Sequence, residues 1–295
     1  SFIEFQIWDF PNDFDLFDPS FDAFAVFGQI GTLVYVIDAQ DDYTDSLAKL
    51  HMIIVRAFAC NPDISFEVFI HKVDGLSDDF KFDIQRDIQR RLVDELADEG
   101  LEDIQVNFYL TSIYDRSIYE ACSKVVQKLI PQLPTLENLL DMLCSNSGIE
   151  KAFLFDIESK LYLATDSSPV DMQSYEICSE MIDIILDLSA IYGQCTHASH
   201  GEWTDNAQSV IKLASGITLF FRQIDCHLAL ICLMRTENYE NHGLLDHNVR
   251  CFKDAVTEVF EMQRMHVARD HPHQHGHDEA EGEATNHNTA VSQSS

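Results

Sequence analysis

The sequence predicts an α/β domain with a parallel, doubly wound sheet, followed by a smaller α+β domain. Three observations carry this prediction. Residues 1–131 alternate β-branched or aromatic runs with stretches of helical periodicity, which is the pattern of repeated β-α units. The segment Pro131-Gln-Leu-Pro134 then interrupts this pattern. After it, several strands follow one another closely and long helices flank them, as is typical of a locally paired sheet.

In the first domain, the expected strands are apolar and the expected helices are amphipathic. Residues 33–38 form a continuous β-branched run, as a strand covered on both faces requires. We expect Ser77 to cap a long helix whose first turn is acidic and which stops at Gly100. A later helix has to end before Pro131. The expected strands are residues 2–8, 33–38, 66–70 and 106–110, and the expected helices are 43–59, 77–99 and 118–129, with a partly helical segment at 13–28.

The second domain is expected over residues 135–267. A hairpin is expected at 151–156 and 161–164, three strands at 209–213, 218–223 and 227–233, and helices at 135–146, 172–192 and 245–265. Residues 194–206 form a polar loop. From residue 268 the chain loses apolar content and becomes rich in His, Glu and Ser, which indicates a disordered tail. Its alternating histidines are interpreted as part of a solvated tail rather than as a metal site.

The composition limits the classes of partner. The formal net charge is −31, from 50 acidic and 19 basic residues, which argues against a nucleic-acid or anionic-membrane surface. The 8 cysteines contain no C-x-x-C pair, so the sequence favours reduced thiols over a disulfide framework or a zinc site. No apolar run approaches the length of a membrane span, so direct membrane insertion is not expected. The chain starts at Ser1, within an expected strand, and we interpret it as a fragment of a longer protein.

Three short polar motifs each follow an expected strand. They are Trp8-Asp9-Phe10-Pro11, His71-Lys72-Val73-Asp74-Gly75 and Thr111-Ser112-Ile113. In an open α/β sheet, ligands sit beyond the carboxyl ends of the strands. The three motifs therefore describe one site, although they lie far apart in the sequence.

The residue types in these motifs suit a purine nucleotide. The carboxylate of Asp74 can accept two hydrogen bonds from the N1–H and exocyclic amine of guanine, an edge that adenine lacks. The stem of Lys72 can lie across the purine face. Backbone N–H groups around Ser112 and Ile113 can bind the base oxygen. Asp9 suits an outer-shell contact to a magnesium ion on the phosphates.

At this point the chain resembles the Rag small GTPases, specifically the C/D type. The resemblance rests on several segments and spans about residues 1–265. They are Phe5-Gln-Ile-Trp-Asp-Phe-Pro11, Tyr35-Val-Ile-Asp-Ala-Gln-Asp41, Phe66-Glu-Val-Phe-Ile-His-Lys-Val-Asp-Gly75, Phe108-Tyr-Leu-Thr-Ser-Ile-Tyr114, Lys124-Val-Val-Gln-Lys-Leu-Ile-Pro-Gln-Leu-Pro134, Ser147-Gly-Ile-Glu-Lys-Ala-Phe-Leu-Phe155 and Ala164-Thr-Asp-Ser-Ser-Pro-Val170.

The resemblance implies a partial Ras-like P-loop GTPase domain over residues 1–131 and a roadblock-like dimerisation domain over 135–267. It implies GTP or GDP as the ligand, with Mg²⁺ in the full-length parent. The residues implied in nucleotide binding are His71, Lys72, Asp74, Ser112 and Ile113, with Asp9, Asn12 and Asp13 in switch II and near the metal. His71 stands where most GTPases have Asn.

The implied biology is that of an obligate heterodimer. A C/D-type subunit pairs with an A/B-type Rag GTPase, binds a lysosomal scaffold complex, and recruits the target-of-rapamycin kinase complex when amino acids are plentiful. The expected location is the cytoplasm and the lysosomal surface, with the nucleus as a second location.

The sequence departs from the family pattern in two ways. Asn12 and Asp13 stand at the glycine and the water-orienting glutamine of switch II, so we expect very slow GTP hydrolysis. No G-x-x-x-x-G-K-[ST] motif occurs, so we expect feeble nucleotide binding and assign no catalytic residue and no metal ligand. The doubly wound sheet is then expected to lack its first strands, including the central one. That leaves a gap of roughly 9–10 Å between the strands at 2–8 and 33–38.

Two other interpretations remain open. The chain is a pseudo-GTPase scaffold that acts through its dimer interface, an alternative that Asn12 and Asp13 favour. The apolar residues of helix 172–192 are either its own core or that interface. Alternatively, the first domain is a phospho-receiver that uses Asp9 and Asp38 with Lys72, but this alternative explains neither Asp74 nor Ser112.

Overall fold

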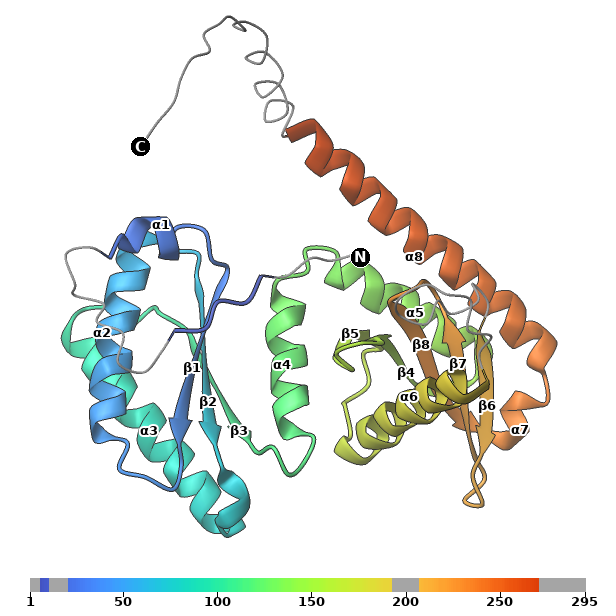
Figure 1. Ribbon diagram of the computed structural model, residues 1–295, viewed down its shortest axis with the longest axis horizontal. Coiled ribbons are helices and arrows are strands. Elements are labelled where there is room, and N and C mark those ends of the chain that lie inside the picture. The colour runs from blue at the N-terminus through green and yellow to red at the C-terminus, as the bar shows by residue number, and fades with distance from the viewer. Residues whose placement is uncertain (1–5, 11–20, 193–206, 271–295) are drawn as a thin grey trace, which may run out of the picture.

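The structure is a computed structural model that describes residues 6–10, 21–192 and 207–270. These residues form a parallel sheet with its helices and an antiparallel sheet with its helices, and α4 lies between the two sheets (Figure 1). The fold class predicted from the sequence, an α/β domain followed by an α+β domain, is therefore confirmed.

The first sheet contains β1 (Thr32–Asp38), β2 (Ser65–His71) and β3 (Val106–Thr111) in the order β1-β2-β3, all parallel. They correspond to three of the four predicted strands. The intervening helices are α2 (Thr44–Cys60) and α3 (Asp78–Asp98), with a short α1 (Ala23–Phe27) before β1 and α4 (Ser117–Lys128) after β3. Parallel strands need such helical crossovers, and the sequence supplies one for each connection.

The two faces of this sheet differ in how they are covered. On one face, Val68 and Ile70 of β2 pack with Leu50 of α2 and Leu92 of α3 in a core of buried side chains. On the other face, Phe69 packs against α4. Alternation along β1 places Val34 and Val36 on the face opposite Ile37. They are 42% and 58% exposed, so β1 is apolar but uncovered there.

The strand predicted at residues 2–8 does not form in the part that is described. Residues 6–10 have no regular structure, and Ile7 is 91% exposed. A strand forms only when it pairs with a neighbouring strand, and none of the described strands pairs with this segment. Among the described residues, β1 is the edge strand of the sheet. The predicted gap between β1 and a strand at residues 2–8 is therefore not seen in the described part of the chain. In the predicted segment 13–28, α1 is the helical part, and residues 13–20 lie outside the described residues.

The long helix α3 begins and ends close to the predicted positions, but its start is stabilised differently. Ser77 is the N-cap residue, yet its side chain makes no capping hydrogen bond; instead its carbonyl accepts from Lys81 N at 3.0 Å. Asp78 and Asp79 occupy the first turn, where the helix dipole favours negative charge. Gly100 follows the helix with φ +74°, a conformation that glycine adopts without steric cost.

The second sheet is antiparallel, with the order β5-β4-β8-β7-β6. The predicted hairpin is β4 (Ile149–Asp156) with β5 (Tyr162–Thr165), and the three later strands are β6 (Gln208–Lys212), β7 (Ile217–Gln223) and β8 (Leu228–Arg235). One face is covered by α5 (Leu133–Ser147) and α8 (His242–Asp270), and the other by α6 (Met172–Tyr192). A short α7 (Thr236–Tyr239) joins β8 to α8. The predicted polar loop and the tail beyond residue 270 lie outside the described residues.

Helix α4 contacts both sheets. It covers Phe69 of β2, and it also lies against β5, where Tyr162 N donates to Ser123 Oγ at 3.1 Å. Near the start of α4, Arg116 lies 4.0 Å from Asp183 of α6. The helix therefore connects the end of β3 to the second domain.

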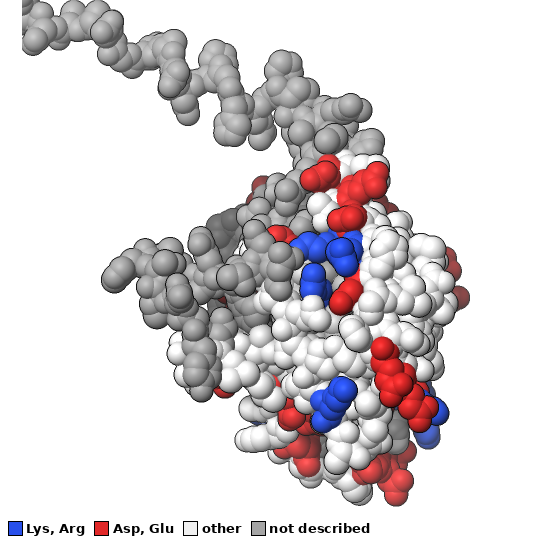
Figure 2. All heavy atoms as spheres, turned by 90° about the vertical axis from the view of Figure 1, so that its right-hand side faces the viewer, with Lys and Arg blue, Asp and Glu red and all other residues white. Residues whose placement is uncertain are grey.

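The surface over the second domain agrees with the acidic composition. On the face drawn in Figure 2, the basic side chains are few and lie beside acidic ones, so the described residues of this face form no continuous basic surface. All seven described cysteines are free. Among the described residues, no helix is both long enough and apolar enough to span a bilayer.

Candidate functional site

The carboxyl ends of the three parallel strands lie in one row. The register pairs Asp38 of β1 with His71 of β2, and His71 with Thr111 of β3. The second and third sequence motifs therefore meet at one edge of the sheet, as the parallel arrangement predicts. Asp38 joins them from β1.

Asp74 lies in a tight turn directly after β2. The turn is a 3-10 helix, η1 (Val73–Gly75), and it brings the Asp74 carboxylate back to the end of β3. There Ser112 Oγ donates to Asp74 Oδ1 at 2.6 Å. Ser112 Oγ in turn accepts from Tyr114 N at 3.1 Å, which fixes its direction. The structure thus brings together two residues that the sequence assigned to the same site.

The backbone N–H groups of the third motif are not equivalent. Ser112 N donates to Ser117 Oγ at 2.9 Å, so this N–H is already used within the protein. No hydrogen bond among the described residues involves the N–H of Ile113. The Ile113 side chain is 67% exposed. Of the two backbone donors considered from the sequence, Ile113 N–H is the one available to a ligand.

Lys72 is held by two residues that follow β1. Its ammonium pairs with Asp38 Oδ2 at 2.5 Å, and its carbonyl accepts from Gln40 Nε2 at 2.8 Å. Asp38 Oδ1 also accepts from Gln40 N at 2.9 Å. A Cβ on Gly75 would lie 2.5 Å from Gln40 Nε2, so the glycine leaves the space that the amide occupies. Lys72 has a left-handed backbone conformation, φ +64°, and its contacts with Asp38 and Gln40 hold it there.

The charges of this pair support each other. The hydrogen bond from Lys72, followed by that from Gln40 N, holds the pKa of Asp38 below its ordinary value. The Asp38 carboxylate raises the pKa of Lys72. Both groups are therefore charged near neutral pH. The nucleotide interpretation of the sequence did not include Asp38 as the partner of Lys72. Only the phospho-receiver alternative grouped these two residues.

His71 connects β2 to β3 through its side chain. Its Nδ1 lies 3.0 Å from Thr111 Oγ1, and Thr111 Oγ1 also lies 3.4 Å from the carbonyl of Ile70. Thr111 is fully buried and His71 is half-buried. The imidazole therefore stands at the same sheet edge as Asp74 and Ser112.

No hydrogen bond or ion pair among the described residues joins Asp9 of the first motif to the other two motifs. Asp9 is exposed, and Asn12 and Asp13 lie outside the described residues. No cluster of three or more His, Cys, Asp or Glu side chains in the described part of the chain is placed to hold a metal ion. A single carboxylate does not hold Mg²⁺ by itself, so the outer-shell contact expected for Asp9 stays a prediction. The phospho-receiver alternative requires Asp9 to lie with Asp38 and Lys72. Among the described residues, Lys72 pairs with Asp38, but no hydrogen bond or ion pair joins Asp9 to either of them.

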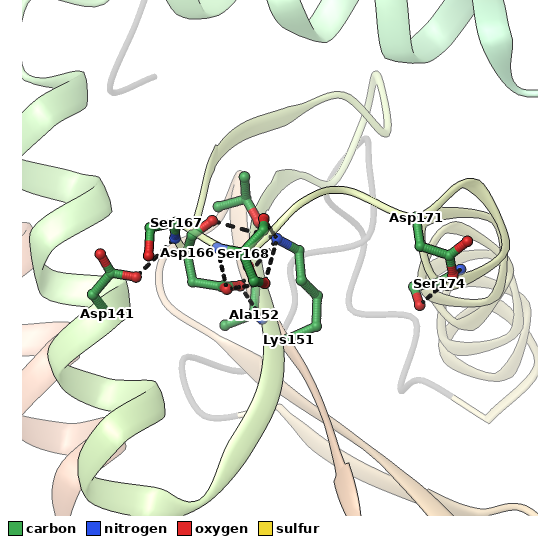
Figure 3. A network of polar contacts seen from close by, with 9 residues as sticks. Asp141, Lys151, Ala152, Asp166, Ser167, Ser168, Asp171 and Ser174 are labelled. Atoms are coloured by element: carbon green, nitrogen blue, oxygen red, sulfur yellow. Dashed lines mark hydrogen bonds and ion pairs between the residues drawn. The ribbon is translucent and has the colours of Figure 1, made fainter.

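The second domain contains a buried charge network that the sequence analysis did not identify (Figure 3). Lys151 Nζ donates to Ser168 O at 2.6 Å and lies 3.2 Å from Asp166 Oδ1. The Asp166 carboxylate also accepts from Ala152 N at 2.8 Å and from Ser168 N at 3.1 Å. Burial raises the pKa of Asp166, but these hydrogen bonds and Lys151 outweigh burial and hold the pKa below its ordinary value.

These hydrogen bonds attach residues 166–168, which follow β5, to Lys151 and Ala152 of β4. A cavity of about 220 Å³ lies beside this network, lined in part by Glu150, Lys151 and Ser168. The ammonium of Lys151 has its partners within the protein, and Asp171 at the start of α6 is occupied by Ser174 N at 2.9 Å. The Lys151 ammonium and Asp171 Oδ2 thus already have partners within the protein. The strand ends of the first domain, where Asp74, Ser112, His71 and Lys72 meet in one row, are the candidate binding site.

The chain is similar to several known proteins. The model of the "Gtr1/RagA G protein conserved region" matches residues 1–182. The chain is 58% identical over 262 residues to the mouse "Ras-related GTP-binding protein C", covering 89% of this chain and 66% of that protein. It is 57% identical over 263 residues to the Schizosaccharomyces pombe "GTP-binding protein gtr2", covering 88% of this chain and 84% of that protein. The chain thus spans slightly less than two thirds of the length of the mouse relative.

Among solved structures, the Roadblock/LC7 domain from Streptomyces avermitilis is similar with a TM-score of 0.33 and 15% sequence identity. The similarity covers 42% of this chain and 97% of that domain.

Proposed function

Because the chain belongs to the Gtr1/RagA family of G proteins, we propose that it binds guanine nucleotides at the ends of β1, β2 and β3. We propose further that it acts as the C/D-type subunit of a Rag heterodimer. The observation that carries the nucleotide proposal is the contact between Asp74 and Ser112. The contact brings the Asp74 carboxylate to the end of β3, next to Ile113, whose N–H has no partner among the described residues.

The arrangement suits guanine rather than adenine. Ser112 occupies one oxygen of Asp74, and the carboxylate keeps acceptor capacity for the N1–H and the exocyclic amine of guanine. Adenine presents an unprotonated N1 at that position, which a carboxylate repels. Ile113 N–H suits the guanine carbonyl oxygen. Asp38 anchors the Lys72 ammonium, and we propose that the Lys72 stem lies across the purine face.

The proposal is tested by titrating the chain with fluorescently labelled GDP, GTP and ATP. We expect GDP and GTP to bind more tightly than ATP, with weak absolute affinity because the sequence contains no phosphate-binding glycine motif. Asp74→Ala should abolish the preference. Asp78→Ala removes an exposed carboxylate from the start of α3 and is the matched control, which should keep it. Equal affinity for GDP and ATP in the unmodified chain would contradict the proposal.

The heterodimer proposal rests on helix α6. Its inner side chains, including Met181 and Ile185, are buried against the second sheet. Its outer side chains Ile184, Leu188 and Ile191 are 48%, 47% and 69% exposed, which leaves an apolar ridge on the described surface. Exposed apolar ridges of this kind mark partner surfaces. The proposed partner is an A/B-type Rag subunit, which would cover the ridge.

A scaffold that does not depend on nucleotide is the second candidate function. The same ridge favours it, because the ridge needs no nucleotide to bind a partner. Asn12 and Asp13 agree with it, since aspartate cannot orient an attacking water as an amide does. One measurement distinguishes the nucleotide switch from the scaffold. Association with an A/B-type subunit should change with GDP or GTP for a switch and stay constant for a scaffold.

The wider setting is proposed from the family alone. We propose that the heterodimer binds a scaffold complex on the lysosomal surface and signals amino-acid sufficiency to the target-of-rapamycin kinase complex. The protein would then be cytoplasmic and recruited to that surface, with the nucleus as a second location. Imaging of the tagged protein with and without amino acids tests this proposal. A distribution unrelated to lysosomes under both conditions would contradict it.

A further inference from the structure

Lys72 has an unusual backbone conformation for its residue type. Among the described residues, Lys72 and Lys160 are the residues other than glycine with a positive φ, and Lys72 has φ +64° and ψ +35°. The Cβ of an ordinary residue disfavours this left-handed conformation roughly 5- to 30-fold. Residues in such conformations cluster at functional sites, where the surrounding structure has to hold them in place. Lys72 directly follows β2, at the strand ends of the proposed nucleotide site.

The conformation of Lys72 determines where Asp74 lies. Lys72 is the N-cap residue of η1, so its backbone angles set the direction in which the chain leaves β2 and enters this turn. The turn brings Asp74 Oδ1 to 2.6 Å from Ser112 Oγ. If Lys72 relaxed to an extended or right-handed conformation, the turn would point elsewhere and the Asp74 carboxylate would leave the end of β3.

The side chain of Gln40 holds the backbone of Lys72. Gln40 Nε2 donates to Lys72 O at 2.8 Å. Asp38, in contrast, pairs with the ammonium at the far end of the Lys72 side chain, which constrains the backbone less. Gln40 lies in the connection between β1 and α2 and is exposed, so its amide is not part of the packed core. The contact of Gln40 with Lys72 O is therefore the one that restrains the start of η1.

Gly75 leaves the room that the Gln40 amide needs. A Cβ on Gly75 would lie 2.5 Å from Gln40 Nε2 and 3.2 Å from Gln40 Cδ. Gly75 does not have a positive φ, so its backbone conformation alone does not require glycine. Because the amide is at the end of a flexible side chain, alanine at position 75 would displace the amide from Lys72 O rather than distort the turn. A change at Gly75 therefore removes the same hydrogen bond as a change at Gln40.

We propose that Gln40 is a positioning residue of the nucleotide site, which acts through the backbone of Lys72 to align the Asp74 carboxylate with the exocyclic amine of guanine. This assignment rests on the proposed guanine site. It extends that site to the connection between β1 and α2. Because Gln40 acts on the direction of Asp74, its loss reduces the preference for a base that carries the amine, rather than the affinity for every nucleotide.

The test compares the affinities of the full chain for GDP and for inosine diphosphate (IDP), whose base lacks the exocyclic amine. The two nucleotides carry the same phosphates, and both can lie against the Lys72 stem, so their affinity ratio reports the contact of Asp74 with the amine. We expect the unmodified chain to prefer GDP roughly tenfold, as for one hydrogen bond to a charged group. Gln40→Ala should reduce this ratio about fivefold, because Lys72 is then free to leave its left-handed conformation. The matched control is Gln85→Ala, which removes an amide contact to Phe108 O at 3.4 Å and should keep the ratio.

Two further comparisons separate this role from a general structural effect. Gly75→Ala should reduce the ratio as Gln40→Ala does, and the double variant should show no further loss, because both changes remove one hydrogen bond. In Lys72→Gly, the glycine adopts the left-handed conformation without steric cost, so adding Gln40→Ala should leave the ratio unchanged. Circular dichroism checks that each variant is folded.

The outcomes distinguish this assignment from the guanine site on which it rests. If Gln40→Ala lowers the affinities for GDP and IDP equally, or changes neither, the assignment is overturned and the guanine site stands. An effect of Gln40→Ala on the ratio that persists in Lys72→Gly would also overturn the assignment. A chain that binds GDP no better than ATP would overturn the guanine site and the assignment together.

Discussion

Replacing Asp166 with alanine should destabilise the second domain by about 3–5 kcal/mol, because it leaves a buried ammonium without its counter-charge. Lys151 and Asp166 are each 6% exposed, and Lys151 Nζ lies 3.2 Å from Asp166 Oδ1. The substitution also removes the acceptor for Ala152 N, at 2.8 Å. An orphaned buried donor costs about 1–3 kcal/mol by itself. In the variant, Lys151 Nζ still donates to the carbonyl of Ser168 at 2.6 Å. We therefore expect the total destabilisation to stay within about 3–5 kcal/mol.

The adjacent residue supplies a matched control. Glu150 pairs with Arg235 at 2.8 Å, but these side chains are 49% and 71% exposed. Exposed pairs contribute about 0–1 kcal/mol, so Glu150→Ala should have little effect. Urea unfolding followed by circular dichroism gives the free energy of unfolding, and hydrogen exchange at the Ala152 amide reports the lost bond locally. If Asp166→Ala costs no more than Glu150→Ala, the reasoning about buried charge is refuted.

The remaining predictions concern the binding site, the α6 ridge and acid stability. Asp38→Ala should free the Lys72 ammonium and lower GDP affinity by roughly two- to fivefold in a fluorescence titration, without a change in unfolding free energy. Aspartate at both Ile184 and Leu188 should abolish co-elution with an A/B-type Rag subunit in size-exclusion chromatography and leave the circular dichroism spectrum unchanged. Because the folded-state pKa of Asp166 is lowered, its stabilisation is complete above the ordinary aspartate pKa of about 3.9 and is lost as the pH falls through the lower folded value. Urea unfolding from pH 7 downward should show this loss, and Asp166→Asn should show less of it.

Much of the first domain could be predicted because its signals are local. The β-branched run at β1 and the helical spacing of Leu47, Leu50 and Ile54 determine element type without reference to distant residues. Parallel pairing then places the strand ends in one row, which is why Asp74 and Ser112 could be assigned to one site from motif order alone.

What the sequence could not predict depends on partners that are distant along the chain. Residues 6–8 have the composition of a strand, but a strand also needs a neighbour, and none is described beside them. The hydrogen bond from Gln40 to Lys72 spans 32 positions, and it needs the space beside Gly75. The Lys151–Asp166 pair depends on the turn after β5, where no spacing rule applies.

The most direct test of the guanine site is a change of base preference in Asp74→Asn. Xanthine carries a carbonyl where guanine carries its amine, and an asparagine amide can donate to that carbonyl while its own oxygen accepts N1–H. Loss of the carboxylate should cost GDP roughly 10- to 100-fold in affinity, the value of a hydrogen bond to a charged group. Side-by-side titration with GDP and XDP should therefore show a reversal, with the unmodified chain preferring GDP and Asp74→Asn preferring XDP. An unchanged GDP-to-XDP ratio in the variant would show that Asp74 does not read the base.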